Sequence, residues 1–194
     1  MATPKELIAS VAEHTGVPLA TVIVHDRNLA EEGLRSPALR GRGVSRVTYQ
    51  DAANLLIAVA ASRNVKDSAK TVREYVDLMS HEPMFSGEEK RGRTFGDALA
   101  ALLEAVPAAR ERFSGPEGDR ITVALFGPKA RARIDVMRQD EKPQRWDYEA
   151  EGESWPKRPA GKHPPIADLT FISEFTQITI GCVGELVAGE PERS

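Results

Sequence analysis

The spacing of apolar residues changes along this chain of 194 residues, and that change limits what the chain can fold into. In several segments between residues 7 and 106, apolar side chains recur every three or four positions, which is the spacing of amphipathic helices. Between residues 121 and 137 they alternate with polar residues on both sides of Gly127-Pro128-Lys129-Ala130, which predicts a β-hairpin. We therefore expect an α+β protein.

Local signals mark the ends of several expected helices. Thr3-Pro4-Lys5-Glu6 is a capping box with proline at the first helical position, and Gly33 stands where a helix-terminating glycine belongs. Thr48 and Asp51 open another helix, and Pro107 is expected to break or kink the one that precedes it. The expected helices cover about residues 4–14, 18–32, 48–61, 64–79, 94–106 and 174–187, with a strand at 169–172 and a long polar loop at 138–165.

A change of composition divides the chain. Between His81 and Arg93 it is rich in proline, glycine, serine and charge, which predicts a domain boundary. We expect an N-terminal domain over residues 1–62, a helical connector and linker over 63–93, and an α+β domain over 94–194. The last of these contains the hairpin and would serve dimerisation or partner binding.

A basic segment runs against the overall charge of the chain. Residues 35–46 hold four arginines and no acid, whereas the whole chain carries a formal net charge of -3. An acidic protein repels phosphate as a whole, so nucleic-acid binding requires a local patch of this kind. The segment therefore indicates contact with DNA phosphates. The alternative is that its arginines are simply solvated, some of them paired with Glu31 or Glu32.

The stretch before the basic segment has helix-turn-helix spacing. Ala12, Gly16 and Val22 follow the pattern A-x3-G-x5-V, in which glycine serves the tight turn. Residues 13–34, followed by the basic segment in the place of a wing, resemble the winged helix-turn-helix DNA-binding regulators. The helix that opens at residues 47–51 is similar to that of MerR-type domains. The resemblance covers about residues 5–60 and implies a winged helix-turn-helix over residues 1–62.

The resemblance also implies roles for individual side chains. Thr21, His25 and Asn28 would lie along the recognition helix, and Arg27 would contact a phosphate or a guanine edge. The wing arginines would contact phosphates or enter the minor groove; these are Arg35, Arg40, Arg42 and Arg46. Two features depart from the pattern: the recognition helix carries Leu19, Ile23 and Val24, and no long coiled coil follows the wing.

Taken together, these features predict a cytoplasmic, sequence-specific protein of prokaryotic or phage type that binds double-stranded DNA. We expect a transcriptional regulator, a repressor, acting as a homodimer, because two half-sites add binding energy. The apolar helix at residues 52–61 is a candidate interface, unless the domain core uses it. Two alternatives remain: a phage DNA-packaging or replication-initiation factor, and an adaptor or inhibitor that binds protein and no DNA.

Other classes of protein find no support in the sequence. Cys182 is the only cysteine, which fits a reducing cytosol, and no apolar run approaches the roughly 20 residues of a membrane span. The four histidines and the cysteine lack metal-ligand spacing, and no motif of a known catalytic class occurs. We expect no enzymatic activity, no metal and no essential cofactor.

Overall fold

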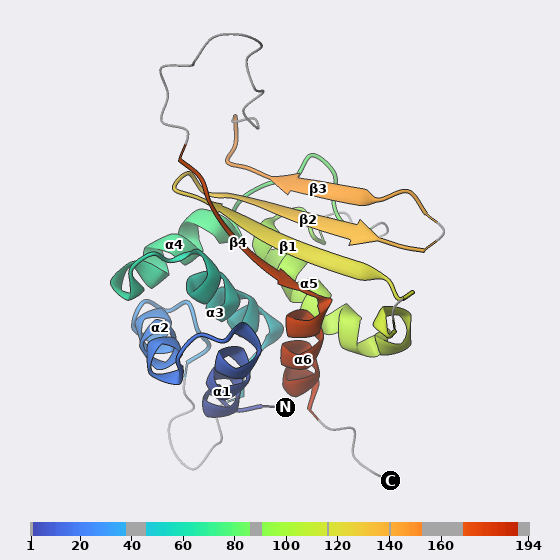
Figure 1. Ribbon diagram of the computed structural model, residues 1–194. Helices are drawn as coiled ribbons and strands as arrows, with labels where there is room; N and C mark the ends of the chain where they lie inside the picture. The colour runs from blue at the N-terminus through green and yellow to red at the C-terminus, as the bar shows by residue number, and fades with distance from the viewer. Residues whose placement is uncertain are drawn as a thin grey trace.

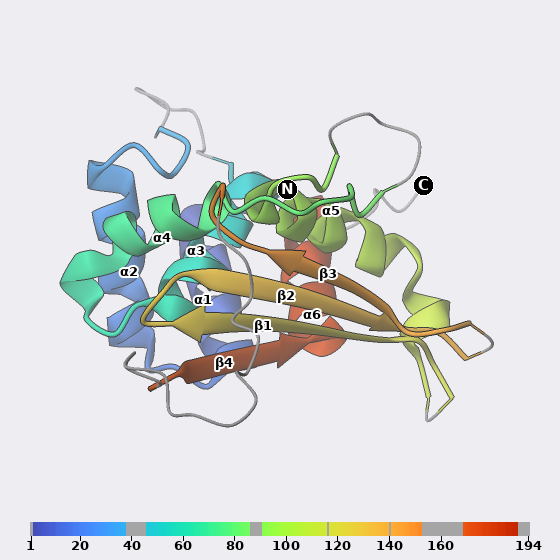
Figure 2. The same ribbon diagram turned by 90° about the horizontal axis from the view of Figure 1, so that it is seen from above.

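The structure is a computed structural model that describes residues 2–37, 46–85, 91–115, 117–139, 141–152 and 169–189. In these ranges it consists of six α-helices and a four-stranded antiparallel sheet, which confirms the α+β class. The helices form a layer against one face of the sheet, as Figures 1 and 2 show from two directions. Among the described residues, no helix has the length and apolar character that a membrane crossing requires.

The first three helices follow the sequence signals closely. They are α1 (Pro4–Thr15), α2 (Leu19–Glu31) and α3 (Tyr49–Ala61). The capping box of α1 is present, with Thr3 and Glu6 each bonding the other's backbone N–H. Gly16 ends α1 at φ 71°, in the left-handed region where a side chain would be strained, and so allows the sharp turn into α2.

The middle of the chain departs further from prediction. The helix expected over residues 64–79 is a 3-10 turn, η1 (Val65–Asp67), followed by α4 (Ser68–Val76). It stops early because Met79 is in extended conformation, in isolated bridges with Thr94 and Glu149. Helix α5 (Phe95–Ala108) then runs one residue past Pro107, so the proline stands in the last turn of the helix, and η2 (Arg110–Phe113) follows.

The predicted hairpin is the centre of the sheet. It consists of β1 (Arg120–Gly127) and β2 (Arg131–Met137), paired in antiparallel register with Val123 opposite Ile134. Strands β3 (Gln144–Tyr148) and β4 (Phe171–Thr176) flank it, giving the order β3-β2-β1-β4. Strand β3 falls in the expected polar loop, and that prediction was wrong. Its apolar residues Trp146 and Tyr148 alternate with polar ones, so a period of two was already visible in the sequence.

The last helix, α6 (Gln177–Ala188), begins three residues later than expected because β4 extends to Thr176. It brings the C-terminal part of the chain back to the N-terminal part. Thr179 Oγ1 of α6 donates to the backbone oxygen of His14 in α1 over 3.3 Å.

One hydrophobic core spans both halves of the chain. It contains Leu7 of α1, Leu55 of α3, Ile134 of β2 and Val187 of α6, all of them buried. The boundary expected between residues 81 and 93 therefore does not separate two cores. Helix α3 lies at the centre and touches α1, α2, α4, α5 and α6 as well as the sheet. Because residues 51–58 are buried in their own chain, the apolar face of α3 is not available as the dimer interface considered above.

The contact between α5 and α6 predicts a sharp difference between two glycines of α6. A Cβ placed on Gly184 would lie 2.0 Å from the backbone oxygen of Leu103, whereas one on Gly181 would lie 3.5 Å from a methyl group of Val106. We expect Gly184→Ala to lower the free energy of unfolding by about 2 kcal/mol or more, because the helices must separate. Gly181→Ala should be neutral or stabilising by up to about 1 kcal/mol. Urea denaturation of the two variants measures this, and equal effects would contradict the packing described.

Candidate nucleic-acid interface

Helix α2 lies at one side of the helical layer, away from α5 and α6 (Figures 1 and 2). It packs on α1, α3, α4 and η1. Its inward face is formed by Val22, His25, Asp26 and Leu29, all buried. Its outward face carries Leu19 and Ile23, which remain 51% and 48% exposed, together with Arg27. The described part of the C-terminal half thus leaves Leu19 and Ile23 on the outer side of α2 exposed.

Two of the side chains expected to read bases are used inside the protein. His25 is only 3% exposed, and its Nδ1 lies 2.7 Å from Ser68 Oγ. Because the Ser68 hydroxyl donates to the backbone oxygen of Val65, His25 must be the donor to Ser68. Burial lowers the pKa of His25, which favours its neutral form. Asn28 donates from Nδ2 to the same Val65 oxygen over 2.8 Å.

The expected base-reading stripe is therefore turned toward the corner between η1 and α4. Residues 21, 25 and 28 share one stripe of a helix because they are four and three positions apart. Thr21 is half-buried at one end of this stripe. The spacing in the sequence predicts that these residues share one face of α2. It does not predict whether that face is exposed or packed against another part of the chain.

Arg27 is the expected DNA contact that the structure leaves on the outer face of α2. Its Nε lies 3.7 Å from Glu31 Oε1, one helical turn away, and both side chains are about two-thirds exposed (66% and 67%). Such an exposed pair contributes little to stability and exchanges readily with solvent or with another anion.

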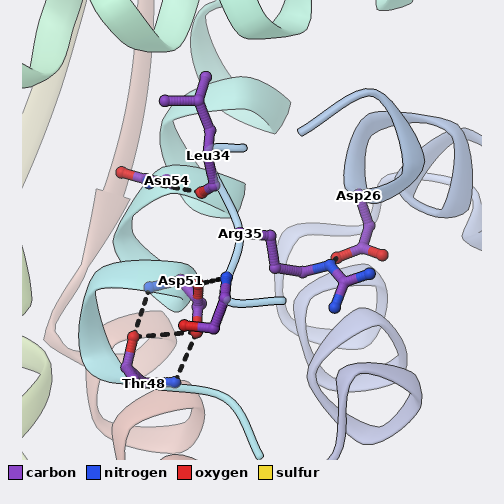
Figure 3. A network of polar contacts seen from close by, with 7 residues as sticks. Asp26, Leu34, Arg35, Thr48, Asp51 and Asn54 are labelled. Carbon is purple, nitrogen blue, oxygen red and sulfur yellow. Dashed lines mark hydrogen bonds and ion pairs between the residues drawn. The ribbon is translucent and has the colours of Figure 1, made fainter. Parts of the chain in front are cut away.

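The residues directly before and after residues 37–47 both contact one carboxylate, that of Asp51 at the start of α3 (Figure 3). Asp51 Oδ1 accepts from the backbone N–H of Ser36 over 2.7 Å. Its Oδ2 accepts from the backbone N–H of Thr48 over 2.8 Å and from the Thr48 hydroxyl over 2.9 Å. Asp51 itself is only 4% exposed, although its partners Ser36 and Thr48 are less buried. The two ends of residues 37–47, which we call the arginine segment, are therefore held together.

Further contacts fix the chain that leads into the arginine segment. Asn54, one turn along α3, donates from Nδ2 to the backbone oxygen of Leu34 over 2.8 Å. At the other end, the backbone N–H of Val47 donates to the oxygen of Ala2 over 3.0 Å. The sequence predicts Asp51 only as a residue of the helix terminus. The spacing of Thr48 and Asp51 indicates the cap, but nothing local predicts a contact with Ser36.

Arg35 does not belong to the exposed arginines. Its Nε lies 3.0 Å from Asp26 Oδ1, and the two side chains are only 16% and 9% exposed. Figure 3 shows the Arg35 side chain directed toward Asp26 of α2. The expected contact of Arg35 with phosphate is thus replaced by an internal ion pair, because Asp26 needs a partner when α2 packs on the chain. The sequence placed Asp26 among apolar positions of α2 without indicating this partner.

The remaining wing arginines stand differently. Arg46 is exposed, next to the buried Val47. Arg40 and Arg42 lie outside the described residues, and so does the core of the expected wing. The arginine segment contains these three arginines, the glycines at 41 and 43, and no acid.

The ionic state of Asp26 is set by opposing influences. Burial raises the pKa of its carboxyl, the guanidinium of Arg35 lowers it, and the charge of Asp51 raises it. The net direction is upward, so ionisation of Asp26 costs the folded state some of its stability. Arg35 reduces that cost.

A second kind of site to consider among the described residues is a metal site. Within the part of the chain that the structure describes, no group of three or more His, Cys, Asp or Glu side chains could hold a metal ion.

No protein-family model, curated protein or solved structure matches this chain.

Removal of Arg35 is expected to destabilise the protein in a pH-dependent way. Arg35→Met retains the apolar stem but leaves Asp26 buried without its partner, which raises the pKa of Asp26 further. At pH 8 the ionised carboxylate should cost about 3 kcal/mol of unfolding free energy. The loss should shrink as the pH falls toward 4, because protonated Asp26 no longer needs the cation.

Chemical denaturation of the wild type and of Arg35→Met across this range measures the effect. Arg27→Met, which removes an exposed arginine from the same region, is the matched control and should change stability little at any pH. A loss for Arg35→Met that is equal at pH 4 and pH 8 would contradict the proposed role of the ion pair.

Proposed function

We propose that this chain binds double-stranded DNA through the arginine segment, residues 37–47, and acts as a transcriptional regulator. The observation that carries the proposal is the convergence of both ends of this segment on Asp51. A segment with fixed ends has fewer conformations to lose when its arginines meet phosphates, so more of the contact energy remains as affinity.

The charges of the segment suit the DNA backbone. Arg40, Arg42 and Arg46 stand among small and apolar residues, with no acid among them to compete for the guanidinium groups. Guanidinium groups bind phosphate oxygens through paired hydrogen bonds, and phosphate contacts supply most of the salt-dependent affinity for DNA. Because the chain as a whole is acidic, this local charge is what directs DNA to the segment.

The proposed contact rests more on phosphates than on base edges. His25 and Asn28 are engaged with Ser68 and Val65, so the outer face of α2 offers Arg27 as its main polar contact for a base edge or a phosphate. A regulator built this way would draw sequence preference from Arg27 and from arginines in the minor groove. We retain repression as a homodimer as part of the proposal; its interface must lie elsewhere than on α3.

A second function is favoured by one observation. Leu19 and Ile23 lie one turn apart on the outer face of α2 and are 51% and 48% exposed. Two adjacent aliphatic side chains suit contact with another protein better than contact with DNA. An adaptor or inhibitor that binds a protein through α2 is therefore the alternative.

The DNA proposal predicts a specific change in salt dependence. We expect the wild type to bind a random-sequence 30-base-pair duplex at low salt, measured by fluorescence anisotropy between 20 and 200 mM salt. Arg40→Ala/Arg42→Ala should bind more weakly to every sequence, and its slope of log K against log salt should be shallower by roughly 2, one unit for each lost phosphate contact.

A matched variant separates local from general charge effects. Lys70→Ala/Lys142→Ala also removes two exposed cations, but at sites distant in sequence from the arginine segment. Its slope should stay close to that of the wild type. Equal slopes for the two double variants, or the absence of wild-type binding at 20 mM salt, would overturn the proposal. The adaptor would be favoured if the wild type binds DNA only weakly and binds a protein partner that Leu19→Ser/Ile23→Ser no longer binds.

A further inference from the structure

A cavity lies at the opposite end of the helical layer from α2, between α5, η2 and the sheet. Its volume is about 190 Å³, and most of its lining is apolar. Leu102, Ala105 and Val106 of α5 form one wall, and Ile121 and Val136 of the paired strands β1 and β2 lie opposite. These elements belong to the continuous core, so the cavity has walls that are held in place by the rest of the fold.

Aromatic side chains surround this cavity and are not fully buried. Phe85, Phe113 and Trp146 line it, and each remains partly exposed. Partly exposed aromatic rings in contact with a cavity present apolar surface that an apolar ligand can cover. Met84 also lines the cavity and can adapt to a ligand because its side chain is flexible.

Among the described residues that line the cavity, three carry charged side chains. They are the guanidinium groups of Arg112 and Arg138 and the carboxylate of Asp119. Arg112 Nη2 lies 2.9 Å from Asp119 Oδ2, and the Arg112 side chain is 58% exposed. A guanidinium has five N–H donors, so the pair with Asp119 leaves donors of Arg112 for a second anion. Arg138 Nη1 lies 2.7 Å from Glu141 Oε2, so both guanidinium groups have a carboxylate partner, and the remaining donors of Arg112 are what the lining offers to an anion.

From this combination we propose that the cavity binds a small molecule with one aromatic ring and one carboxylate. The pocket is partly open to solvent, and its volume of about 190 Å³ exceeds the roughly 150 Å³ of a closed apolar cavity that holds one benzene ring, so a ring with a small substituent fits it. The ring would lie among the aromatic side chains, and its carboxylate would meet Arg112. The site is independent of the proposed DNA contact, because none of its lining residues belongs to α2 or to the described part of the arginine segment.

Sodium benzoate is the probe, and benzamide is its neutral counterpart of nearly equal shape. The chain has two tryptophans, so Trp155→Phe leaves Trp146 as the reporter of fluorescence. In that background we expect benzoate to change the emission of Trp146 saturably, with a Kd on the order of 1 mM, as suits a ligand of this size. Benzamide should bind at least about fivefold more weakly, because it lacks the charge that pairs with Arg112. In Arg112→Gln that difference should vanish.

A pair of alanine substitutions on one helix locates the site. Ala105→Leu fills the cavity and should abolish the response, whereas Ala108→Leu places the same side chain at an exposed position of α5 outside the lining and should leave it unchanged. Should Ala105→Leu fail to fold, chemical-shift changes in the wild type on adding benzoate provide the second test. They should include Leu102, Phe113 and the Trp146 indole.

Absence of saturable binding up to 20 mM benzoate would overturn the proposal, as would full binding by a folded Ala105→Leu or shift changes that avoid the lining. Equal binding of benzoate and benzamide would remove the assignment of a carboxylate ligand. None of these results bears on DNA binding, so the two proposals fail separately.

Discussion

The carboxylate of Asp51 is the contact that joins the local structure of the N-terminal half to the core. It accepts hydrogen bonds from both Ser36 and Thr48, which precede and follow the arginine segment. It also stands in the first turn of α3, the helix that touches every other α-helix and the sheet. Asp51 therefore ties both ends of the arginine segment to a helix at the centre of the described structure. A carboxylate is suited to this task because each of its oxygens accepts more than one hydrogen bond.

The arginines of the N-terminal half divide into those that build the fold and those that are proposed to bind. Arg35 is enclosed with Asp26 and ties the exit of α2 to the chain that follows. Arg46 is exposed, and Arg40 and Arg42 stand in the segment that we propose to contact phosphates. The enclosed pair and the Asp51 contacts lie side by side in Figure 3. Arg35 thus contributes to stability, whereas Arg40, Arg42 and Arg46 are proposed to bind DNA. The composition of the basic cluster does not distinguish these two roles.

Much of the fold was predictable because its signals are local. The capping boxes at Thr3 and Thr48, the glycine turn at Gly16 and the alternation around residues 127–130 each involve residues within a few positions of one another. Strand β3 was missed although its alternation was visible, because its polar positions and flanking prolines suggested a loop. The site was less predictable. His25 faces the protein interior because it contacts Ser68, 43 positions away in the sequence, and Asp51 contacts Ser36, 15 positions away. The period of a helix does not encode such distant contacts.

The role of Asp51 is tested most directly by comparing Asp51→Asn with the control Glu6→Gln in affinity for a duplex of random sequence, at a temperature where both variants are folded. Both changes remove one negative charge from a capping box, so general electrostatics predicts slightly tighter binding for each. Only Asp51 also holds the start of the arginine segment. We expect Glu6→Gln to bind at least as well as the wild type. We expect Asp51→Asn to bind about tenfold more weakly, as when the competent arrangement falls to about a tenth of the population. Binding by a folded Asp51→Asn as tight as that of Glu6→Gln would contradict this role of Asp51.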